Sequence, residues 1–452
     1  MIRIGLGKGF GGVLCLLSMC RLSAPAEPYG LASRPPAKAY LNMPETAEGQ
    51  PPKLLSQTGA FTDTRNLIPS SALIPYVINV SFWSDGAAKS RWISVPNEGT
   101  AKTISFKPSG EWSFPAGTVF AKHFEFATDE SHPEQKRRLE TRLLVCDRTG
   151  TVYGVTYKWR ADNSDADLLA TNLIEPVIVK TPVGTKTQNW FYPSRQDCRV
   201  CHTDLAGGVL GVKTRQMNCE FQFPKGIKDN QLRAWNHVGL FNPTLREEGV
   251  ATFAKLAAAS DTSRPLEDRA RSYLDANCAQ CHRPGGTVAY FDARYDTPLA
   301  QQGLLGGQVL IDENIDGARA IAPNDRWRSI VFLRMSRLEG LRMPPLAHET
   351  LDHQGIALIQ QWIESLPGPR VLPPPAFAPP PGEFKQPVTV TLSETTPGAT
   401  IHYTLDGSAP TKSDPAYEHP IKITEPTVLR AKAFKSGLTK SITVQAVYII
   451  GQ

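Results

Sequence analysis

Two five-residue motifs carry the residue types that are most capable of chemistry in this chain. They are Cys198-Arg-Val-Cys201-His202 and Cys278-Ala-Gln-Cys281-His282. Two thiols separated by two residues lie on about one helical turn, so both can add to the vinyl groups of one porphyrin. The histidine that follows them then projects toward the iron as its proximal ligand. The two motifs therefore predict two covalently bound c-type haems.

Other cysteine chemistries explain the two motifs less completely. A zinc site would use both cysteine pairs, but 76 residues lie between Cys201 and Cys278, far more than in a zinc ribbon. A thioredoxin-like dithiol needs one pair and neither histidine. Both alternatives leave part of the pattern unexplained, and haem attachment explains all of it.

Met343 is the candidate for the other side of the second iron. It stands in Arg342-Met343-Pro344-Pro345, 61 residues beyond His282, and the prolines restrict the backbone of the loop that presents it. A methionine opposite a histidine raises the reduction potential and leaves no vacant iron position, which favours electron transfer. Met335 lies in a helical-looking stretch and is expected in the core.

The sixth ligand of the first iron stays open at this stage. Met217 and His237 follow His202 by 15 and 35 residues, and either is a candidate. An open iron position, or a different ligand, is the third alternative. An open position is the arrangement that haem enzymes use for substrate or oxygen chemistry.

The N-terminus is typical of an export signal. Residues 1–26 have a positively charged start, a short apolar core and an Ala24-Pro25-Ala26 cleavage site. The apolar core is too short to span a bilayer, so no transmembrane anchor is expected. The mature protein is thus expected in the periplasm, or secreted to the cell surface. Lipoprotein processing at Cys20 is a less favoured alternative, because Met19 is a poor residue before the modified cysteine.

Composition excludes several classes of protein. Eight cysteines in 452 residues are too few for a disulfide scaffold, and no apolar run of 18 residues follows the N-terminus, which excludes a multi-span membrane protein. The net charge of +6 comes without a long basic run, so no nucleic-acid partner is predicted. Cys146 and Cys219 remain after haem attachment, and an oxidising compartment makes them candidates for a disulfide.

The elements around the motifs predict a multi-domain chain. Helical periodicity occurs at both ends of residues 261–367, first after Pro265 and again from Ile356 to Leu366, where Pro367 stops it. The expected fold class is a β-rich N-terminal domain, a mainly α-helical haem domain and an immunoglobulin-like β-sandwich. The expected division is an extended lead-in (27–75), a β-rich domain (76–192), the first haem segment (193–260), the second haem domain (261–367), a proline-rich linker (368–381) and the β-sandwich (382–452).

The segment 261–367 resembles a class I bacterial cytochrome c domain. The resemblance rests on the stretch from Tyr273 to His282, on Met343-Pro344-Pro345, and on a closing helix with Trp362. It implies a small α-helical fold whose first and last helices cross over the haem edge. The family's haem-binding residues correspond here to Cys278, Cys281, His282 and Met343.

The segment 76–242 resembles a poorly characterised group of bacterial di-haem c-type cytochromes. The matching stretches are Phe82–Trp92, Arg138–Leu144 and Cys198–Asn218. The resemblance implies haem binding and export, and it implies no particular reaction. Five residues of the first stretch could line a haem propionate or a substrate, or belong to an ordinary strand and turn: Trp83, Asp85, Lys89, Arg91 and Trp92.

The C-terminal residues 382–452 are similar to the immunoglobulin-like C-terminal domain of chitobiase and β-hexosaminidase enzymes. The similarity lies in Ile401–Gly407, Tyr417, Pro420–Ile423 and Leu429–Phe434. In that family the module is accessory, which implies polysaccharide binding or a spacer role. Few aromatic residues suit a sugar platform, so the spacer is favoured.

These observations predict an exported di-haem c-type cytochrome. It would pass single electrons between a periplasmic donor and a respiratory acceptor, and the sequence identifies no catalytic residue. One alternative is a peroxidase-like di-haem oxidoreductase with an open first iron. Another is a surface carbohydrate-binding protein in which haem has an accessory role.

Overall fold

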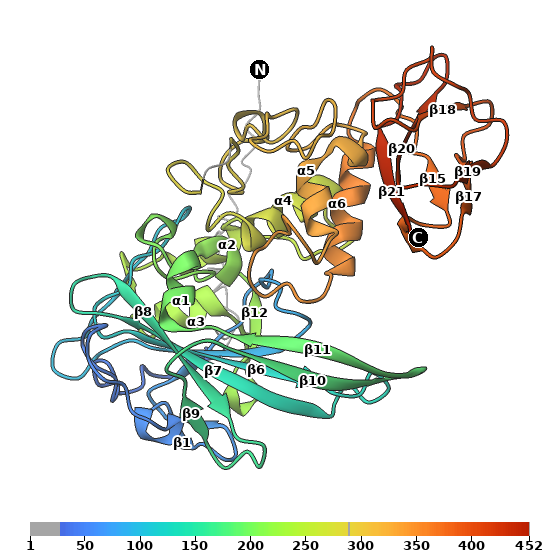
Figure 1. Cartoon of the computed structure of the whole chain (residues 1–452). Helices are drawn as coiled ribbons and strands as arrows, with labels where there is room; N and C mark the ends of the chain where they lie inside the picture. The colour runs from blue at the N-terminus through green and yellow to red at the C-terminus, as the bar shows by residue number, and fades with distance from the viewer. Residues whose placement is uncertain (1–27, 288–289, 452) are drawn as a thin grey trace, which may run out of the picture.

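A six-stranded antiparallel sheet forms the body of the molecule (Figure 1). The computed structural model describes residues 28–287 and 290–451, so the predicted signal peptide, residues 1–26, lies outside the described residues. None of the helices in these ranges is long and apolar enough to cross a membrane. The strands, in spatial order, are β3 (Ile74–Pro75), β4 (Ala88–Ser94), β6 (Val119–Ala127), β7 (Lys136–Cys146), β8 (Val152–Trp159) and β9 (Ala166–Leu168).

One face of this sheet is covered by the N-terminal residues of the described chain. Leu41, Leu55 and Phe61 pack there against Trp92 and Tyr157. The stretch 28–75, expected as an extended lead-in, is thus folded onto the sheet. Its elements are η1 (Leu55–Thr58), β1 (Phe61–Asp63) and β2 (Ile68–Pro69).

The opposite face carries the segment that holds the first motif. Ile93 and Phe120 of the sheet pack there with Met217 and Trp235. The helices of this segment are α1 (Arg195–Cys201), η2 (Asp204–Ala206), α2 (Thr214–Met217), η3 (Pro224–Gly226), α3 (Gln231–His237) and η4 (Glu247–Thr252). Its short strands are β5 (Ile104–Ser105) with β14 (Phe241–Asn242), and β12 (Glu220–Gln222) with β13 (Lys228–Asn230). A hairpin of β10 (Leu173–Thr181) and β11 (Gly184–Tyr192) extends from the body and leads into α1 (Figure 1).

The prediction of a mainly α-helical domain at 261–367 is wrong. The helices predicted at its two ends are confirmed as α4 (Leu266–Asn277) and α6 (His353–Ser365), and α5 (Ile330–Met335) adds six residues. The rest is turns and the short η5 (Leu299–Gln301) and η6 (Arg326–Arg328). The middle lacks a 3.6-residue period and turns through positive φ angles, for example at Asn314.

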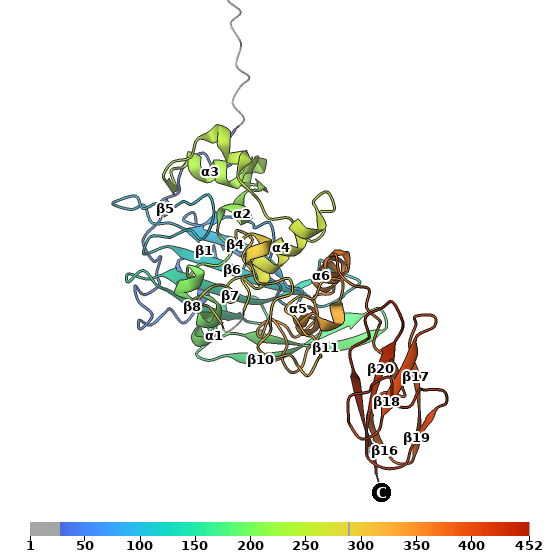
Figure 2. The same cartoon turned by 90° about the horizontal axis from the view of Figure 1, so that it is seen from above.

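This helical segment is also not separate from the sheet body. Helix α4 crosses α6 where Gly355 meets the Tyr273 ring, and the pair lies beside the sheet rather than apart from it (Figures 1 and 2). The Trp83 backbone N–H donates to the side chain of Asn277 at 2.7 Å, which joins the β-rich part to α4. The described chain is therefore mostly β, and helices supplement the sheet.

The C-terminal residues form a two-sheet β domain, as predicted. One sheet contains β15 (Ala376–Ala378), β17 (Val388–Ser393) and β19 (Ile421–Ile423). The other contains β16 (Gly382–Phe384), β21 (Val444–Ile450), β20 (Thr427–Phe434) and β18 (Thr400–Thr404). Apolar residues of both sheets, Val390 and Leu429 among them, fill the space between them. Strand β15 lies inside the stretch expected as a proline-rich linker. Both views place the domain at the end of the molecule, beside α5 and α6 (Figures 1 and 2).

Candidate functional site

The two Cys-x-x-Cys-His motifs lie against each other in the folded chain. The thiols of Cys201 and Cys281 are in contact, and Cys281 Sγ lies 4.0 Å from the carbonyl oxygen of Val200. A hydrogen bond between the two thiols raises the pKa of Cys201 and lowers the pKa of Cys281 to about 7. The fold therefore brings together two motifs that the sequence separates by 76 residues.

Each motif opens into a cavity of its own. We call the one lined by Cys198, Cys201 and His202 the first cavity, and its volume is about 1520 Å³ including space open to solvent. The second cavity, of about 2160 Å³ on the same measure, is lined by Cys278, Cys281, His282 and Met343. Both figures include open solvent, so they locate a recess beside each motif and do not measure an enclosed site.

Local structure turns the first motif toward its cavity. A reciprocal capping box starts α1: the Ser194 hydroxyl accepts from the Asp197 backbone N–H at 3.2 Å, and the Asp197 carboxylate accepts from the Ser194 N–H at 2.8 Å. Strand β8 faces this helix with Gly154. A Cβ on Gly154 would lie 2.9 Å from Cys198 Sγ, so only glycine leaves room for the thiol.

His202 has the arrangement that an iron-binding imidazole needs. Its Nδ1 lies 2.7 Å from the carbonyl oxygen of Gly208, so Nδ1 carries the proton and donates. The lone pair is then on Nε2, and the side chain lines the first cavity. Such a bond to the second ring nitrogen orients metal-binding histidines. Burial lowers the pKa of His202 to about 4, which keeps the ring neutral at pH 7.

His282 and Met343 line the second cavity together. The His282 ring stacks on Phe291, with centroids 4.5 Å apart and planes 9° apart. Burial lowers its pKa to about 4. Its Nδ1 is buried and has no hydrogen-bond partner among the described residues. Met335 also touches this cavity, but it is packed in the core between α4 and α6.

Trp83 and Asp85, two of the possible cofactor contacts, fasten the loop after Met343 to the sheet body. The Asp85 carboxylate accepts from the backbone N–H groups of Glu349 and Thr350 at 2.7 and 2.9 Å. The Trp83 indole donates to the Thr350 carbonyl at 3.1 Å. Burial raises the pKa of Asp85, although these backbone bonds favour the carboxylate. Trp83 and Asp85 therefore position the Met343 loop.

Neither candidate for the sixth position of the first iron lines the first cavity. Met217 is fully buried in the apolar core cluster that also contains Trp112 and Trp235. His237 stacks on Tyr29, with ring centroids 3.5 Å apart. Trp92 belongs to the core on the opposite face of the sheet. The structure brings none of the three to the first cavity.

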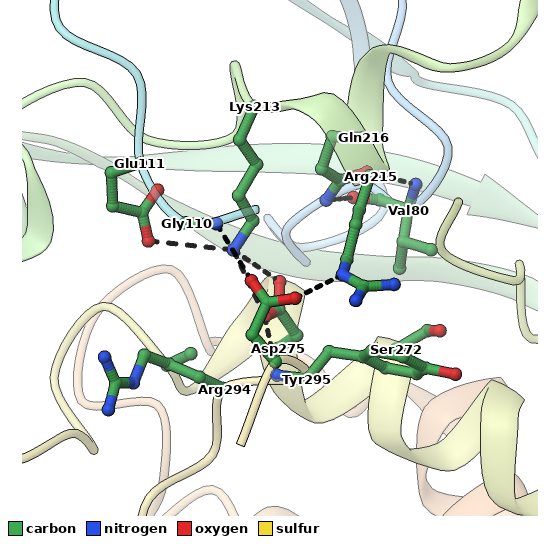
Figure 3. A network of polar contacts seen from close by, with 12 residues as sticks. Val80, Gly110, Glu111, Lys213, Arg215, Gln216, Ser272, Asp275, Arg294 and Tyr295 are labelled. Carbon is green, nitrogen blue, oxygen red and sulfur yellow. Dashed lines mark hydrogen bonds and ion pairs between the residues drawn. The ribbon is translucent and has the colours of Figure 1, made fainter. Parts of the chain in front are cut away.

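A buried polar network fastens α4, which leads directly into the second motif, to the segment of the first motif (Figure 3). Lys213 Nζ lies 2.8 Å from Asp275 Oδ1 and 3.7 Å from Glu111 Oε1. Burial by itself would lower the pKa of Lys213, but Asp275 and Glu111 outweigh it and the pKa is raised. Arg283, next to His282, also pairs with Glu111 at 2.9 Å. These ion pairs determine how the two motifs face each other.

Two basic residues of the first cavity could not be recognised from the sequence. Lys122 on β6 and Arg142 on β7 line the cavity beside Arg91 on β4. Burial, together with neighbouring cations, holds the pKa of Lys122 well below its usual value. Along their strands Lys122 and Arg142 alternate with apolar residues, and this alternation is the signal in the sequence that could have indicated them. The strand register that brings the two side chains together is visible only in the fold.

Cys146 and Cys219 do not form a disulfide. Both are free thiols. Cys146 is buried in the sheet core, and Cys219 Sγ accepts from the Gln231 amide at 3.0 Å. Within the described ranges, no group of three or more His, Cys, Asp or Glu residues could hold a metal ion. The two cysteine pairs thus do not form a zinc site there.

Comparisons with known proteins identify only the C-terminal module. The family model of the chitobiase/beta-hexosaminidase C-terminal domain matches residues 379–445. No cytochrome c family model matches the chain. The curated proteins and the solved structures contain no match either. Residues 379–445 therefore carry a chitobiase/beta-hexosaminidase C-terminal domain, which lies outside both motifs.

Proposed function

We propose that this chain is an exported c-type cytochrome that holds two haems and relays single electrons. One observation carries the proposal: each of two distant Cys-x-x-Cys-His motifs lines its own cavity, and the motifs meet at Cys201 and Cys281. A zinc site or a dithiol would not require two such cavities. The expected partners are a periplasmic electron donor and a respiratory acceptor.

The residues of each cavity have distinct roles in this proposal. Cys198 and Cys201 would attach the first haem, and Cys278 and Cys281 the second. His202 and His282 would each bind an iron, with Met343 opposite His282. Bound in this way, haem iron supplies one-electron redox chemistry. The protein's own contribution is to orient the imidazoles, to exclude water and to set the polarity around each site.

The shared wall between the cavities supports a relay. Phe82, Cys201, Gln280 and Leu346 line both cavities. Electron tunnelling falls steeply with distance, so two sites separated by one layer of side chains exchange electrons faster than sites in separate domains. The ion pairs of Lys213 and Arg283 keep that wall closed.

The two cavities differ in charge, which predicts two different potentials. Among the described residues that line the second cavity, Arg334 carries the only full charge, and it pairs with Glu313 at 2.9 Å. An apolar environment with a thioether ligand raises the reduction potential. The first cavity contains several cations, which also raise a reduction potential, but no methionine is among its described lining residues. We expect two resolved one-electron steps in a redox titration.

The haem content tests the proposal directly. The mature protein, made in a host with cytochrome maturation machinery, is expected to give two haems per chain in a pyridine haemochrome assay, with a matching gain in intact mass. We expect one haem per chain in each of two double variants, Cys198→Ala/Cys201→Ala and Cys278→Ala/Cys281→Ala. Cys146→Ala/Cys219→Ala is the matched control and should keep two. A colourless protein with the mass of the polypeptide alone would overturn the proposal.

A further inference from the structure

Three cations stand side by side on the sheet face that lines the first cavity. Arg91 on β4 is directly opposite Lys122 on β6, and Lys122 is directly opposite Arg142 on β7. All three side chains line the cavity. Like charges directly opposite each other on neighbouring strands destabilise a sheet. We call these three residues the cation row, and it needs an anion in front of it.

Only one member of the cation row has a carboxylate partner. Arg142 pairs with Glu140 at 2.5 Å. In the part of the chain that the structure describes, no carboxylate oxygen lies within 4.0 Å of the Arg91 guanidinium or the Lys122 ammonium. Arg91 donates to the Ser81 hydroxyl at 3.0 Å, and Lys122 lies 5.0 Å from the Phe124 ring centroid.

The acidic residues that line the first cavity are already engaged. Glu111 and Asp275 pair with Lys213, and Glu111 also pairs with Arg283. Asp197 caps the start of α1 through Ser194. Arg91 and Lys122 therefore face the cavity without an acidic partner, and an anion beside Lys122 would favour the charged form that burial disfavours.

The position of the cation row matches the far edge of a porphyrin attached at the first motif. Cys198 contacts β8 at Gly154, and the row crosses β7, β6 and β4 in order away from that strand. Neighbouring strands are about 4.8 Å apart, so Lys122 and Arg91 stand roughly 10 and 14 Å from β8. In a c-type haem the thioether bonds are at one edge and the two propionates are at the opposite edge.

We infer that Arg91 and Lys122 bind the two propionate carboxylates of the haem attached at Cys198 and Cys201, an inference that rests on the proposed function. Two carboxylates give each of these two residues an acidic partner. Charge-assisted hydrogen bonds of this kind are about twice as strong as neutral ones. A small free oxyanion has the same chemistry, and the experiments below separate the two sources.

The first experiment measures the reduction potentials of the full-length protein with Lys122→Gln. Removing a positive charge near the iron favours the oxidised form. The potential of one haem should fall by about 59 mV, which is tenfold in the ratio of oxidised to reduced haem, while the other stays unchanged. Lys136→Gln, at the exposed start of β7, is the matched control and should change neither. Two bound haems with both potentials unchanged by Lys122→Gln would overturn the inference.

The second experiment removes the anion source. In the Cys198→Ala/Cys201→Ala protein the cation row has no propionates, so Lys122→Gln should raise the midpoint of denaturant unfolding. In the wild-type background the same change should lower it. If Lys122→Gln lowers the unfolding midpoint equally in the wild-type protein and in the Cys198→Ala/Cys201→Ala protein, Lys122 has a structural role and the inference is contradicted. The haem assay on the same samples shows separately whether the proposed function holds.

The third experiment tests a free oxyanion, with sodium sulfate as the probe because sulfate is a poor ligand of haem iron. Because the propionates occupy the row, sulfate at constant ionic strength should produce no saturable change in the Soret band of the oxidised wild-type protein. A saturable change that Lys122→Gln abolishes would assign the row to a free oxyanion and reject the propionates.

Discussion

At Gly154 a single hydrogen atom leaves room for the Cys198 thiol, to which the proposed first haem would be attached. Replacing this hydrogen with a methyl group puts carbon 2.9 Å from Cys198 Sγ, and such overpacking typically costs about 1–3 kcal/mol. We expect Gly154→Ala to reduce the haem content from two toward one and to lower the unfolding temperature. Pyridine haemochrome and thermal unfolding measure both effects.

The control for this change is Gly249→Ala. Gly249 has open space around its missing Cβ, so this substitution should keep two haems. If Gly154→Ala also keeps two haems at wild-type stability, the contact between β8 and Cys198 does not limit attachment.

At the second iron, Met343 can be tested against a neighbouring methionine. Met343→His replaces a thioether with an imidazole, which lowers the potential of a haem iron. We expect both haems to remain and the potential of one to fall. Met335→Leu preserves the core volume around α5 and should change neither potential. A shift with Met335→Leu and none with Met343→His would transfer the ligand role to Met335.

At the scale of elements, the buried pair of Lys213 and Asp275 joins α4 to the segment of the first motif (Figure 3). Asp275→Asn leaves the lysine charge buried with only Glu111, at 3.7 Å, as its partner. Removing one partner of a buried ion pair leaves the other charge uncompensated in the interior, so we expect a loss of about 3 kcal/mol in the free energy of unfolding. Lys213→Met/Asp275→Leu removes both charges and should cost much less. Denaturant titrations give the comparison.

The same pair predicts a dependence on pH. Because the folded-state pKa of Lys213 is raised above its usual value of 10.5, its stabilising effect is complete below pH 10.5 and is lost as pH rises through the folded-state pKa. The difference in unfolding free energy between wild type and Lys213→Met should therefore shrink above pH 10.5. A difference that stays constant from pH 8 to pH 12 would contradict this assignment.

Elements also show why the sequence predicted helices correctly and their domain incorrectly. The periodic apolar residues after Pro265 and before Pro367 form α4 and α6 because each helix buries one face against the other. Periodicity says nothing about the aperiodic loops between them. It also cannot show that Asn277 and Thr350 bond to the sheet body through Trp83.

On the scale of the whole molecule, the C-terminal domain is attached to the second haem segment by polar contacts. Lys432 pairs with Asp316 at 3.0 Å, and Arg328 donates to the Lys440 carbonyl at 3.1 Å. The exposed large apolar residues among its described residues are Leu405, Val447 and Ile449, none of them aromatic. This exposed set offers no flat aromatic ring on which a sugar could stack.

We therefore expect the full-length protein to bind no soluble glycan in an array assay. A haem could quench the fluorescent label used in an array. Surface plasmon resonance needs no label and is therefore the confirming measurement. Saturable binding that is lost when residues 379–452 are deleted would show that this domain recognises polysaccharide.

The sequence by itself proposes the haem-binding residues because the chemistry of the motif is local. Cysteine spacing and the adjacent histidine lie within one helical turn, and a helix or a turn of any fold presents them together. Alternation and 3.6-residue periodicity likewise predicted the strands of the sheet, both helices of the second segment and the C-terminal β domain.

Only the tertiary structure decided what surrounds the motifs. The contact of Cys201 with Cys281, the shared wall of the two cavities, and the cation row of Arg91, Lys122 and Arg142 join residues from distant parts of the chain. Strand register and the packing of loops determine these contacts. A one-residue shift in register would turn Lys122 to the other face of the sheet, so no local pattern could predict the row.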